Sequence, residues 1–268
     1  MNITSRQIIA DRQVIASQQV TEQPFLVQPI LQPSMLQQNH LLAAMSAQEW
    51  DEWQTDLEPV DFSLNQVLCE SGKTPSYMYF PTTAIISLLY MTQNGGSSEV
   101  AVVGNDGMVG ISLLLSGSNS PNQALVQSAG KGYRIRAQAA KNALNCSGNM
   151  LNILLCYSQA IITQITQTAV CNRHHTIDQQ LSRRLLLSLD RLCSNQIVVT
   201  QEMLASMLGV RRESITDAAL KLQEAGAISY RRGIITVLDR KALESRTCEC
   251  YAIAKNEQMR LQKIPLNS

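Results

Sequence analysis

Several features that would assign a chain to a common class are missing from this sequence. None of its apolar runs approaches the roughly 20 residues needed to span a bilayer, and its N-terminus has no basic region followed by an apolar one. We therefore expect no membrane span, no secretion signal and no membrane partner, and predict a cytoplasmic protein. Structural disulfides are rare in that reducing compartment.

The sequence also lacks a recognisable metal-binding pattern. Its seven cysteines include no C-x-x-C pair, and Cys248 and Cys250 are closer together than zinc-knuckle ligands usually are. We therefore expect no metal site and no cofactor, and expect the cysteines to act as small core or surface hydrophobes. They are Cys69, Cys146, Cys156, Cys171, Cys193, Cys248 and Cys250.

Catalytic side chains are scarce in the middle of the chain. Residues 59–136 contain no histidine, and their only acids are Asp61, Glu70, Glu99 and Asp106. A small catalytic barrel would need a cluster of histidines and carboxylates. The sequence therefore disfavours an enzyme.

Charge is divided unevenly along the chain. The net charge is +1, but residues 1–172 hold seven basic and eleven acidic side chains, whereas residues 173–268 hold fifteen and ten. Only the C-terminal part is therefore suited to a polyanion such as nucleic acid.

The segment from Gln201 to Leu220 predicts a helix-turn-helix, which places one helix in the major groove of DNA. Gly209 suits the left-handed residue that ends the first helix, and Ala205 is small where the two helices cross. An ordinary helical hairpin with a glycine turn is the alternative. Apolar residues at helical spacing would bury the pair against each other. They are Leu204, Leu208, Val210, Ile215, Ala218, Ala219 and Leu222.

The second helix has an opposite face of polar groups, and a predicted hairpin follows it. Residues 228–237 favour a strand, a tight turn at Arg232-Gly233 and a second strand. In this position the hairpin is a wing whose arginines would meet phosphates, although a solvated basic hairpin is the alternative. The candidate DNA-binding residues are Thr200, Gln201, Arg211, Arg212, Glu213, Ser214, Thr216, Asp217, Arg231 and Arg232.

The predicted fold class is α+β, with an N-terminal antiparallel β-roll resembling a jelly roll. Short strands at roughly ten-residue spacing, separated by turns such as 116–118, carry this prediction. Ser46 and Glu49 predict a capping box just before the strands. The expected domains are a flexible extension (1–38), the roll (39–148), a dimerisation helix (149–172), a winged helix-turn-helix (173–242) and a helical tail (243–268).

The dimerisation helix has a broad apolar stripe, of which Leu154, Ile161 and Ile165 are expected to be buried between two copies. Its members are Met150, Leu151, Leu154, Leu155, Ile161, Ile162 and Ile165. A long helix between two domains often buries such a stripe against a second copy of the chain. Packing only against its own roll is the alternative.

A further amphipathic helix is predicted from Thr176 to Leu192, as the platform beneath the helix-turn-helix. Three of its basic side chains, Arg183, Arg184 and Arg191, are expected at its surface.

A roll, a long helix and a winged helix-turn-helix, in this order, resemble the Crp-Fnr family of bacterial transcription regulators over residues 40–242. The segment 210–215 and the wing carry the resemblance most strongly, and the stretches 102–110 and 180–186 carry it less specifically. The resemblance implies a dimer whose roll receives a small-molecule signal. It also implies that paired recognition helices enter successive major grooves of a near-palindromic site, and it allows RNA polymerase as a partner.

Two base-reading positions of the family can be located in this sequence. The family's Arg-Glu pair falls on Arg212 and Glu213, where the guanidinium could bind guanine and the carboxylate could accept from cytosine. A second family arginine falls on Asp217, which reverses the charge. The operator of the best-known member should therefore not be carried over.

The roll departs from family members that bind cyclic AMP. Those members use a Gly-Glu pair and, about ten residues later, an Arg-Ser pair, but here Ile111 follows Gly110 and residues 118–124 contain no arginine. Because a cyclic phosphate needs positive charge or a set of N–H donors, cyclic nucleotide binding is disfavoured. The candidate effector pocket is made of Gly104, Gly107, Gly110, Ile111, Asn122 and Gln123.

Other sensor types of the family need ligands that the sequence offers only in part. An N-terminal iron–sulfur cluster is excluded because no cysteine precedes Cys69. Haem would need His40, His174 or His175, and the last two are expected to face DNA or solvent. We therefore predict a sequence-specific dimeric regulator with an unidentified effector. The alternative is a constitutive DNA-binding regulator with a vestigial sensor, controlled by abundance or by a protein partner.

Overall fold

The computed structural model describes residues 38–115, 119–146, 148–192 and 194–262. The predicted extension, apart from its last residue, and the predicted turn at 116–118 lie outside the described residues. Within the described part, no helix is both long enough and apolar enough to cross a membrane.

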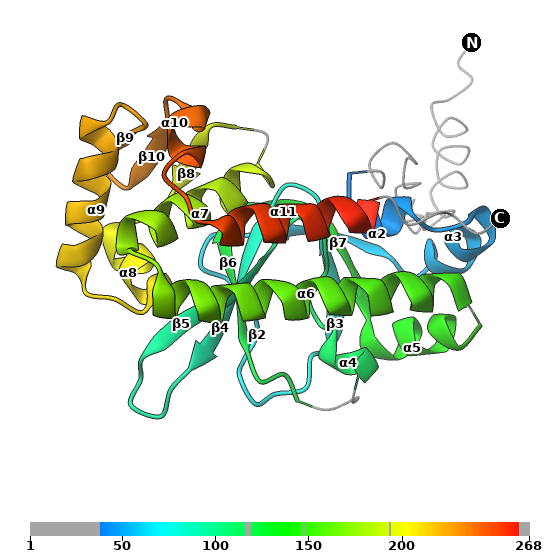
Figure 1. Ribbon diagram of the computed structural model, residues 1–268. Coiled ribbons are helices and arrows are strands. Elements are labelled where there is room, and N and C mark those ends of the chain that lie inside the picture. Colours follow the sequence, from blue (N-terminus) through cyan, green and yellow to red (C-terminus); the bar gives the residue numbers. More distant parts are fainter. Residues whose placement is uncertain (1–37, 116–118, 147, 193, 263–268) are drawn as a thin grey trace, which may run out of the picture. The chain divides into compact units, whose positions relative to one another are not determined.

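Three short helices and seven strands make up the described N-terminal part, and they form the predicted roll (Figure 1). The strands pair antiparallel in two sheets, ordered β1-β7-β3 and β2-β6-β4-β5. The elements are α2 (His40–Ala43), α3 (Ala47–Trp53), β1 (Glu58–Phe62), β2 (Val67–Cys69), β3 (Tyr77–Pro81), β4 (Ile85–Met91), β5 (Ser97–Val103), α4 (Ser112–Leu115), β6 (Gln123–Ser128) and β7 (Gly130–Arg136).

The roll closes around side chains that alternate inward along the strands. Phe62, Ile86 and Val126 belong to one buried cluster between the sheets. The predicted capping box is confirmed, because Ser46 Oγ accepts from the Glu49 amide and the Glu49 carboxylate accepts from the Ser46 amide. The same carboxylate accepts from the Met150 amide at 2.6 Å, and so it also satisfies a free N–H at the start of the next long helix.

Two helices follow the roll, α5 (Ala137–Cys146) and α6 (Gly148–His174), and α6 is the predicted long helix. The C-terminal tail is helical as expected, and its helix α11 (Glu249–Gln262) runs antiparallel along α6 (Figure 1). One side of α6 is therefore covered by the chain's own elements.

Only part of the predicted apolar stripe of α6 is free to contact a second copy, and the prediction is corrected for Leu154 and Ile161. Leu154 is fully buried within its own chain, and Ile161 packs against the core of the roll. The exposed apolar side chains of α6 are Leu151, Leu155 and Ile162 of the predicted stripe, together with Val170, and they lie beside the buried residues on the helix. A surface for a second copy would therefore be made of this second set.

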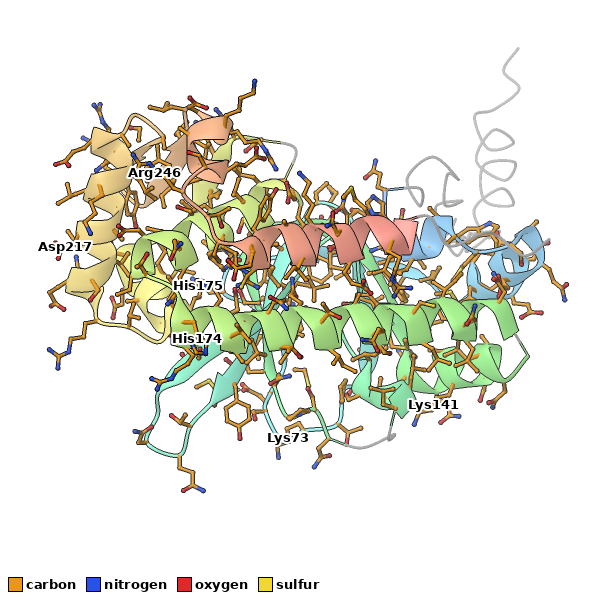
Figure 2. The ribbon with its side chains drawn as sticks, viewed as in Figure 1. Lys73, Lys141, His174, His175, Asp217 and Arg246 are labelled. Carbon is orange, nitrogen blue, oxygen red and sulfur yellow. The ribbon has the colours of Figure 1, made fainter. Side chains whose placement is uncertain are left out.

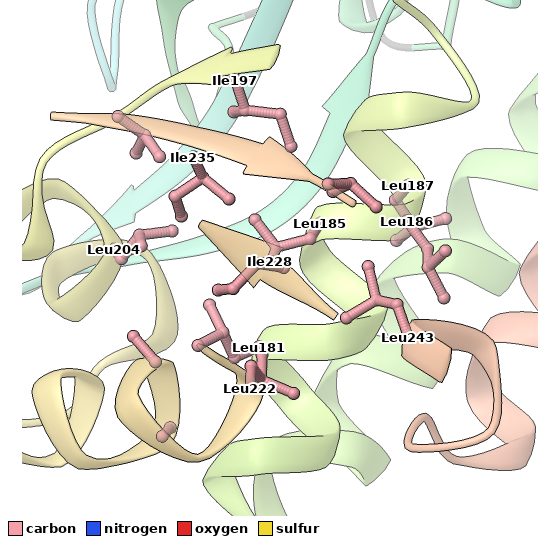
Figure 3. Close-up of a cluster of buried hydrophobic side chains, with 14 of the residues drawn as sticks. Leu181, Leu185, Leu186, Leu187, Ile197, Leu204, Leu222, Ile228, Ile235 and Leu243 are labelled. Carbon is pink, nitrogen blue, oxygen red and sulfur yellow. The ribbon is translucent and has the colours of Figure 1, made fainter. Parts of the chain in front are cut away.

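The winged helix-turn-helix is present as predicted. Its three-stranded sheet has the order β8-β10-β9. Its elements are α7 (Ile177–Leu189), β8 (Gln196–Val198), α8 (Gln201–Leu208), α9 (Arg212–Glu224), β9 (Ile228–Arg231), β10 (Ile234–Val237) and α10 (Arg240–Glu244). Figure 3 shows how side chains from α7, α8, α9 and the wing meet in one apolar core.

Two backbone positions fix the geometry of this domain. Gly209 ends α8 at φ 65°, in the left-handed region that a side chain would disfavour. Arg232 and Gly233 have φ values of 50° and 77° at the wing tip. Two successive left-handed residues make the tight turn that suits the twist of a hairpin.

The predicted surface arginines are buried: Arg183 and Arg184 lie in α7, and Arg191 lies in the turn after it. Arg183, Arg184 and Arg191 are between 3% and 6% exposed. Arg184 donates to the Glu99 carboxylate at 2.7 Å, and Arg191 donates twice to Asp106. Both carboxylates come from the roll. These side chains therefore connect the platform helix to the roll instead of facing solvent.

Candidate nucleic-acid interface and effector cavity

The start of α8 is capped and open to solvent. Thr200 precedes α8, and its Oγ1 accepts from the Met203 amide at 3.1 Å. The remaining free N–H groups of the first turn and the helix dipole favour an anion at this end. Thr200 is exposed and Gln201 is half-buried.

The start of α9 presents the predicted base-reading pair. Arg211 precedes the helix and makes no side-chain cap, while Arg212 and Glu213 are exposed in its first turn. Ile215, two residues later, is fully buried in the core, and this anchors the helix with the opposite side turned outward. Side chains near the N-terminus of such a helix are the ones that reach base edges.

The remaining predicted residues of α9 are Ser214 in its first turn and Thr216 and Asp217 in the next. Asp217 is exposed at the outer side of the helix (Figure 2). Ser214 and Thr216 are half-buried, and Thr216 Oγ1 donates to the Arg212 carbonyl at 3.1 Å. Its hydroxyl oxygen keeps accepting capacity.

The structure brings four of the predicted residues to one surface hollow. The hollow has a volume of about 430 Å³ and lies where the starts of α8 and α9 meet the wing. Tyr230 lines it and donates to the Val199 carbonyl at 2.8 Å, which holds β9 beside the start of α8. The lining residues are Thr200, Gln201, Glu202, Arg212, Tyr230, Arg232 and Gly233.

The wing adds a second positive group beside the hollow. Arg231 and Arg232 are both exposed, at the end of β9 and in the turn. The arrangement therefore combines two wing guanidiniums, the Arg212 guanidinium and a helix N-terminus. Such a combination can contact both the phosphates and the base edges of a duplex.

A second cavity lies in the roll, against α6. Its volume is about 190 Å³, and it is lined by Gly110, Ile111 and Asn122 of the predicted effector pocket. Most of the remaining lining is apolar, including Leu88, Leu115, Ile161 and Ile165 of the described residues. No charged side chain is among the described lining residues, so the cavity offers no cation for a phosphate.

The other predicted pocket residues lie elsewhere, and the prediction is corrected for them. A Cβ added to Gly104 would be 2.8 Å from Arg191, and one added to Gly107 would be 2.6 Å from the Tyr157 ring. These glycines are needed for close approach of the roll to α7 and α6. Gln123 donates to the Glu70 carboxylate at 2.7 Å and does not line the cavity.

The contacts between the roll and the winged domain include buried ion pairs and an exposed hydroxyl pair. Burial lowers the pKa of the Arg184 guanidinium, and the nearby Glu99 carboxylate opposes this shift. Ser97 Oγ of β5 lies 2.5 Å from Ser206 Oγ of α8. The roll therefore touches α7 and α8, and it leaves the start of α9 exposed.

Comparison with known proteins agrees with this architecture. Residues 179–246 match the family of Crp-like helix-turn-helix domains. The match covers the platform helix, the helix-turn-helix and the wing. The resemblance recognised from the sequence is confirmed, and the matched residues are those of a DNA-binding domain. A search of curated protein sequences finds no match.

Solved structures of Crp-Fnr type regulators share the fold at low sequence identity. FixK2 from Bradyrhizobium japonicum is 13% identical, with a TM-score of 0.60 over 72% of this chain and 98% of that one. A CRP family regulator from Thermus thermophilus is 16% identical, with a TM-score of 0.58 over 70% and 95%. The c-di-GMP responsive regulator CLP from Xanthomonas campestris is 13% identical, with a TM-score of 0.54 over 72% and 100%.

Proposed function

We propose that this protein is a homodimeric regulator that binds a near-palindromic DNA sequence through α9 and the wing. The hollow between α8, α9 and the wing carries the proposal, because it gathers Thr200, Gln201, Arg212 and Arg232 at one exposed surface. In this assignment Arg212 and Glu213 contact base edges, and Arg231 and Arg232 contact phosphates.

Selection from a pool of random duplexes tests this assignment directly. The wild-type protein should enrich sequences with two inverted half-sites whose centres are about one helical turn, or 10–10.5 base pairs, apart. The Arg212→Ala variant should lose this enrichment. An Arg246→Ala variant, which removes an exposed arginine outside the hollow, is the matched control and should keep it (Figure 2). If the wild-type protein bound random and selected duplexes equally well, sequence-specific binding would be contradicted.

We infer that the dimer forms through the exposed side of α6. Leu151, Leu155 and Ile162 are between 40% and 54% exposed, which is unusual for a row of large apolar side chains on one helix. Successive members of the row are four and seven residues apart, which is the spacing of a helix–helix seam. A cytoplasmic location, the domain boundaries given above and contact with RNA polymerase also stay part of the proposal.

The roll cavity supports an effector that is not a cyclic nucleotide. A cyclic phosphate placed there would meet Ile111 and no charged group among the described lining residues. Loss of charge-assisted hydrogen bonds costs several kcal/mol, on the order of about 1.5–3 for each one. The cavity suits a small, uncharged and mostly apolar molecule, and it is smaller than the roughly 300 Å³ at which drug-sized sites begin.

A constitutive regulator with a vestigial roll is the second candidate. The buried ion pairs Arg184–Glu99 and Arg191–Asp106 favour this candidate, because they would hold the winged domain against the roll without any ligand. A change in operator affinity on adding a cavity ligand separates the two candidates. If no ligand that binds the cavity changes the operator affinity, the constitutive protein is favoured.

A further inference from the structure

Three cysteines and one histidine that are far apart in the sequence meet at the end of α6. Cys171 lies in the last turn of α6 and His175 directly follows the helix, while Cys248 and Cys250 lie at the start of α11. Their three Sγ atoms and one imidazole nitrogen all lie within 4.8 Å of one another. Figure 2 labels His175 at this junction, between α6 and the winged domain.

The distances suit four ligands around a single ion. Cys171 Sγ is 3.5 Å from Cys248 Sγ, and Cys250 Sγ is 3.6 Å from His175 Nδ1. Around tetrahedral zinc, with Zn–S about 2.3 Å and Zn–N about 2.0–2.1 Å, neighbouring ligand atoms are roughly 3.3–3.8 Å apart. Thiolates that hold a cluster of several iron atoms must be spread more widely, because sulfides and irons lie between them.

The cluster is closed to solvent, as sites with four protein ligands are. The three cysteines are at most 5% exposed and form a small buried group of their own. The His175 side chain is 14% exposed, and its Nε2 lies 3.3 Å from the Glu249 carboxylate. A carboxylate on the outer nitrogen holds the ring so that Nδ1 faces the sulfur atoms, which is the usual support for a histidine ligand.

A buried positive charge next to the cluster has no acidic partner. Arg183 is 5% exposed, donates to Thr168 Oγ1 at 3.1 Å, and makes no ion pair with a carboxylate of the described residues. The Arg183 charge is close enough to interact electrostatically with the Cys171 and Cys250 thiols. A divalent ion with three thiolates and a neutral imidazole carries one net negative charge. Arg183 is placed to balance it.

We propose that Cys171, His175, Cys248 and Cys250 bind one zinc ion as a closed structural site. Three thiolates and an imidazole are a donor set typical of zinc among the divalent metals. The ion would tie the start of α11 to the end of α6, immediately before α7. The proposal does not depend on the function proposed above.

Metal content and cobalt spectroscopy test the site on the full chain. Protein purified from zinc-supplemented medium should hold about one zinc ion per chain. After chelation under reducing conditions, added Co²⁺ should give sulfur-to-metal charge-transfer bands and the strong visible bands of tetrahedral cobalt. Added Zn²⁺ should remove these bands. Stripping the metal should also lower the melting temperature of the wild-type protein, since binding stabilises only the folded state.

Variants separate this site from adventitious binding. Cys248→Ser combined with Cys250→Ser should abolish the zinc content and the cobalt bands. Cys156→Ser, which removes a thiol of α6 outside the cluster, is the matched control and should keep both. The His175→Gln variant keeps the three thiols of the cluster. It should bind cobalt more weakly than the wild-type protein and give an altered spectrum. This variant replaces the double variant if the double variant does not fold.

Two results would overturn the proposal. One is reduced wild-type protein that holds no zinc and gives no cobalt bands. The other is a Cys171–Cys248 disulfide, found by mass spectrometry after alkylation of the freshly purified protein, in place of a metal. A wild-type signal that the double variant keeps would equally assign the metal to another part of the chain.

Discussion

Arg191, in the turn after α7, donates two hydrogen bonds to the Asp106 carboxylate of the roll, Nε to Oδ1 at 2.9 Å and Nη2 to Oδ2 at 2.6 Å. Both side chains are buried, and 85 residues separate them in the sequence. The same guanidinium donates to the Leu187 carbonyl at 2.7 Å. One arginine directly after α7 is therefore fixed both to the end of that helix and to the roll.

Removal of Asp106 should destabilise the protein strongly. The Asp106→Ala variant leaves the Arg191 charge buried without a partner, and the expected cost is about 3–5 kcal/mol in the free energy of unfolding. Urea unfolding followed by circular dichroism measures it. Asp61→Ala breaks a pair with Lys131 in which both side chains are more than two-thirds exposed, and it should cost at most about 1 kcal/mol. Similar losses in the two variants would contradict a structural role for the buried pair.

Removal of Arg212 should weaken recognition of the operator more than binding to random DNA. The Arg212→Ala variant should cost about 1–3 kcal/mol at the selected sequence, because a guanidinium that donates twice to one base is lost. Fluorescence anisotropy with both duplexes gives the two affinities. Equal losses on both would reassign Arg212 to a phosphate.

Neutralisation of the wing should weaken binding to every sequence alike. In the Arg231→Ala, Arg232→Ala double variant, the slope of log affinity against log salt should shrink by about 0.9 for each phosphate that the wing no longer neutralises. Titrations at several salt concentrations measure the slope. The Arg246→Ala variant again serves as the control. An unchanged slope in the double variant would mean that the wing points away from DNA.

A charge on the exposed side of α6 should dissociate the dimer. Ile162→Glu would bury an unpaired carboxylate between two copies, which the assembly cannot tolerate. Sedimentation velocity should show a dimer for the wild-type protein and a monomer for the variant, and operator affinity should fall with it. Leu64→Glu makes the same change at a 43%-exposed leucine of the roll and should remain dimeric. A wild-type monomer that binds its operator tightly would contradict the model of assembly.

Cyclic nucleotides should neither bind nor be required. Isothermal titration with cyclic AMP and cyclic GMP should give no binding heat at physiological concentrations, because the cavity offers no charged side chain among its described lining residues. Operator affinity should be unchanged by either nucleotide. A dissociation constant in the low micromolar range would show that backbone amides hold the phosphate unaided.

The parts that the sequence predicted well are those determined by local physical chemistry. Gly209 at the end of α8, the turn at Arg232-Gly233 and the capping box at Ser46 each involve residues only a few positions apart. Their conformations follow from glycine's freedom, the twist of a hairpin and free N–H groups at a helix start. The spacing of apolar residues along α9 is an equally local signal, and it correctly predicted which side of the helix is exposed.

The parts that the sequence predicted wrongly depend on distant partners. Arg184 on an amphipathic helix suggests a solvated charge, because nothing nearby in the sequence reveals that Glu99 reaches it from the roll. Cys248 and Cys250 have the wrong spacing for a metal motif by themselves. They gain Cys171 only because α11 turns back along α6, 77 residues later. The sequence signals for this cluster were one thiol near the end of a long helix and a pair of thiols after the winged domain.

The exposure of α9 has a consequence for how the roll could control transcription. The first turn of α9 is uncovered although β5 contacts α8, so a signal in the roll has no need to unmask the reading surface. The signal can instead change the orientation of the two α9 helices relative to each other. On B-DNA the two reading helices must stand about 34 Å apart and face the same side of the duplex. A small rotation of one winged domain, transmitted through Arg184 and Arg191, would misalign its α9 with the major groove while the α9 of the other copy stays bound. Regulation in such a dimer would then be a matter of angular alignment between two fully accessible helices.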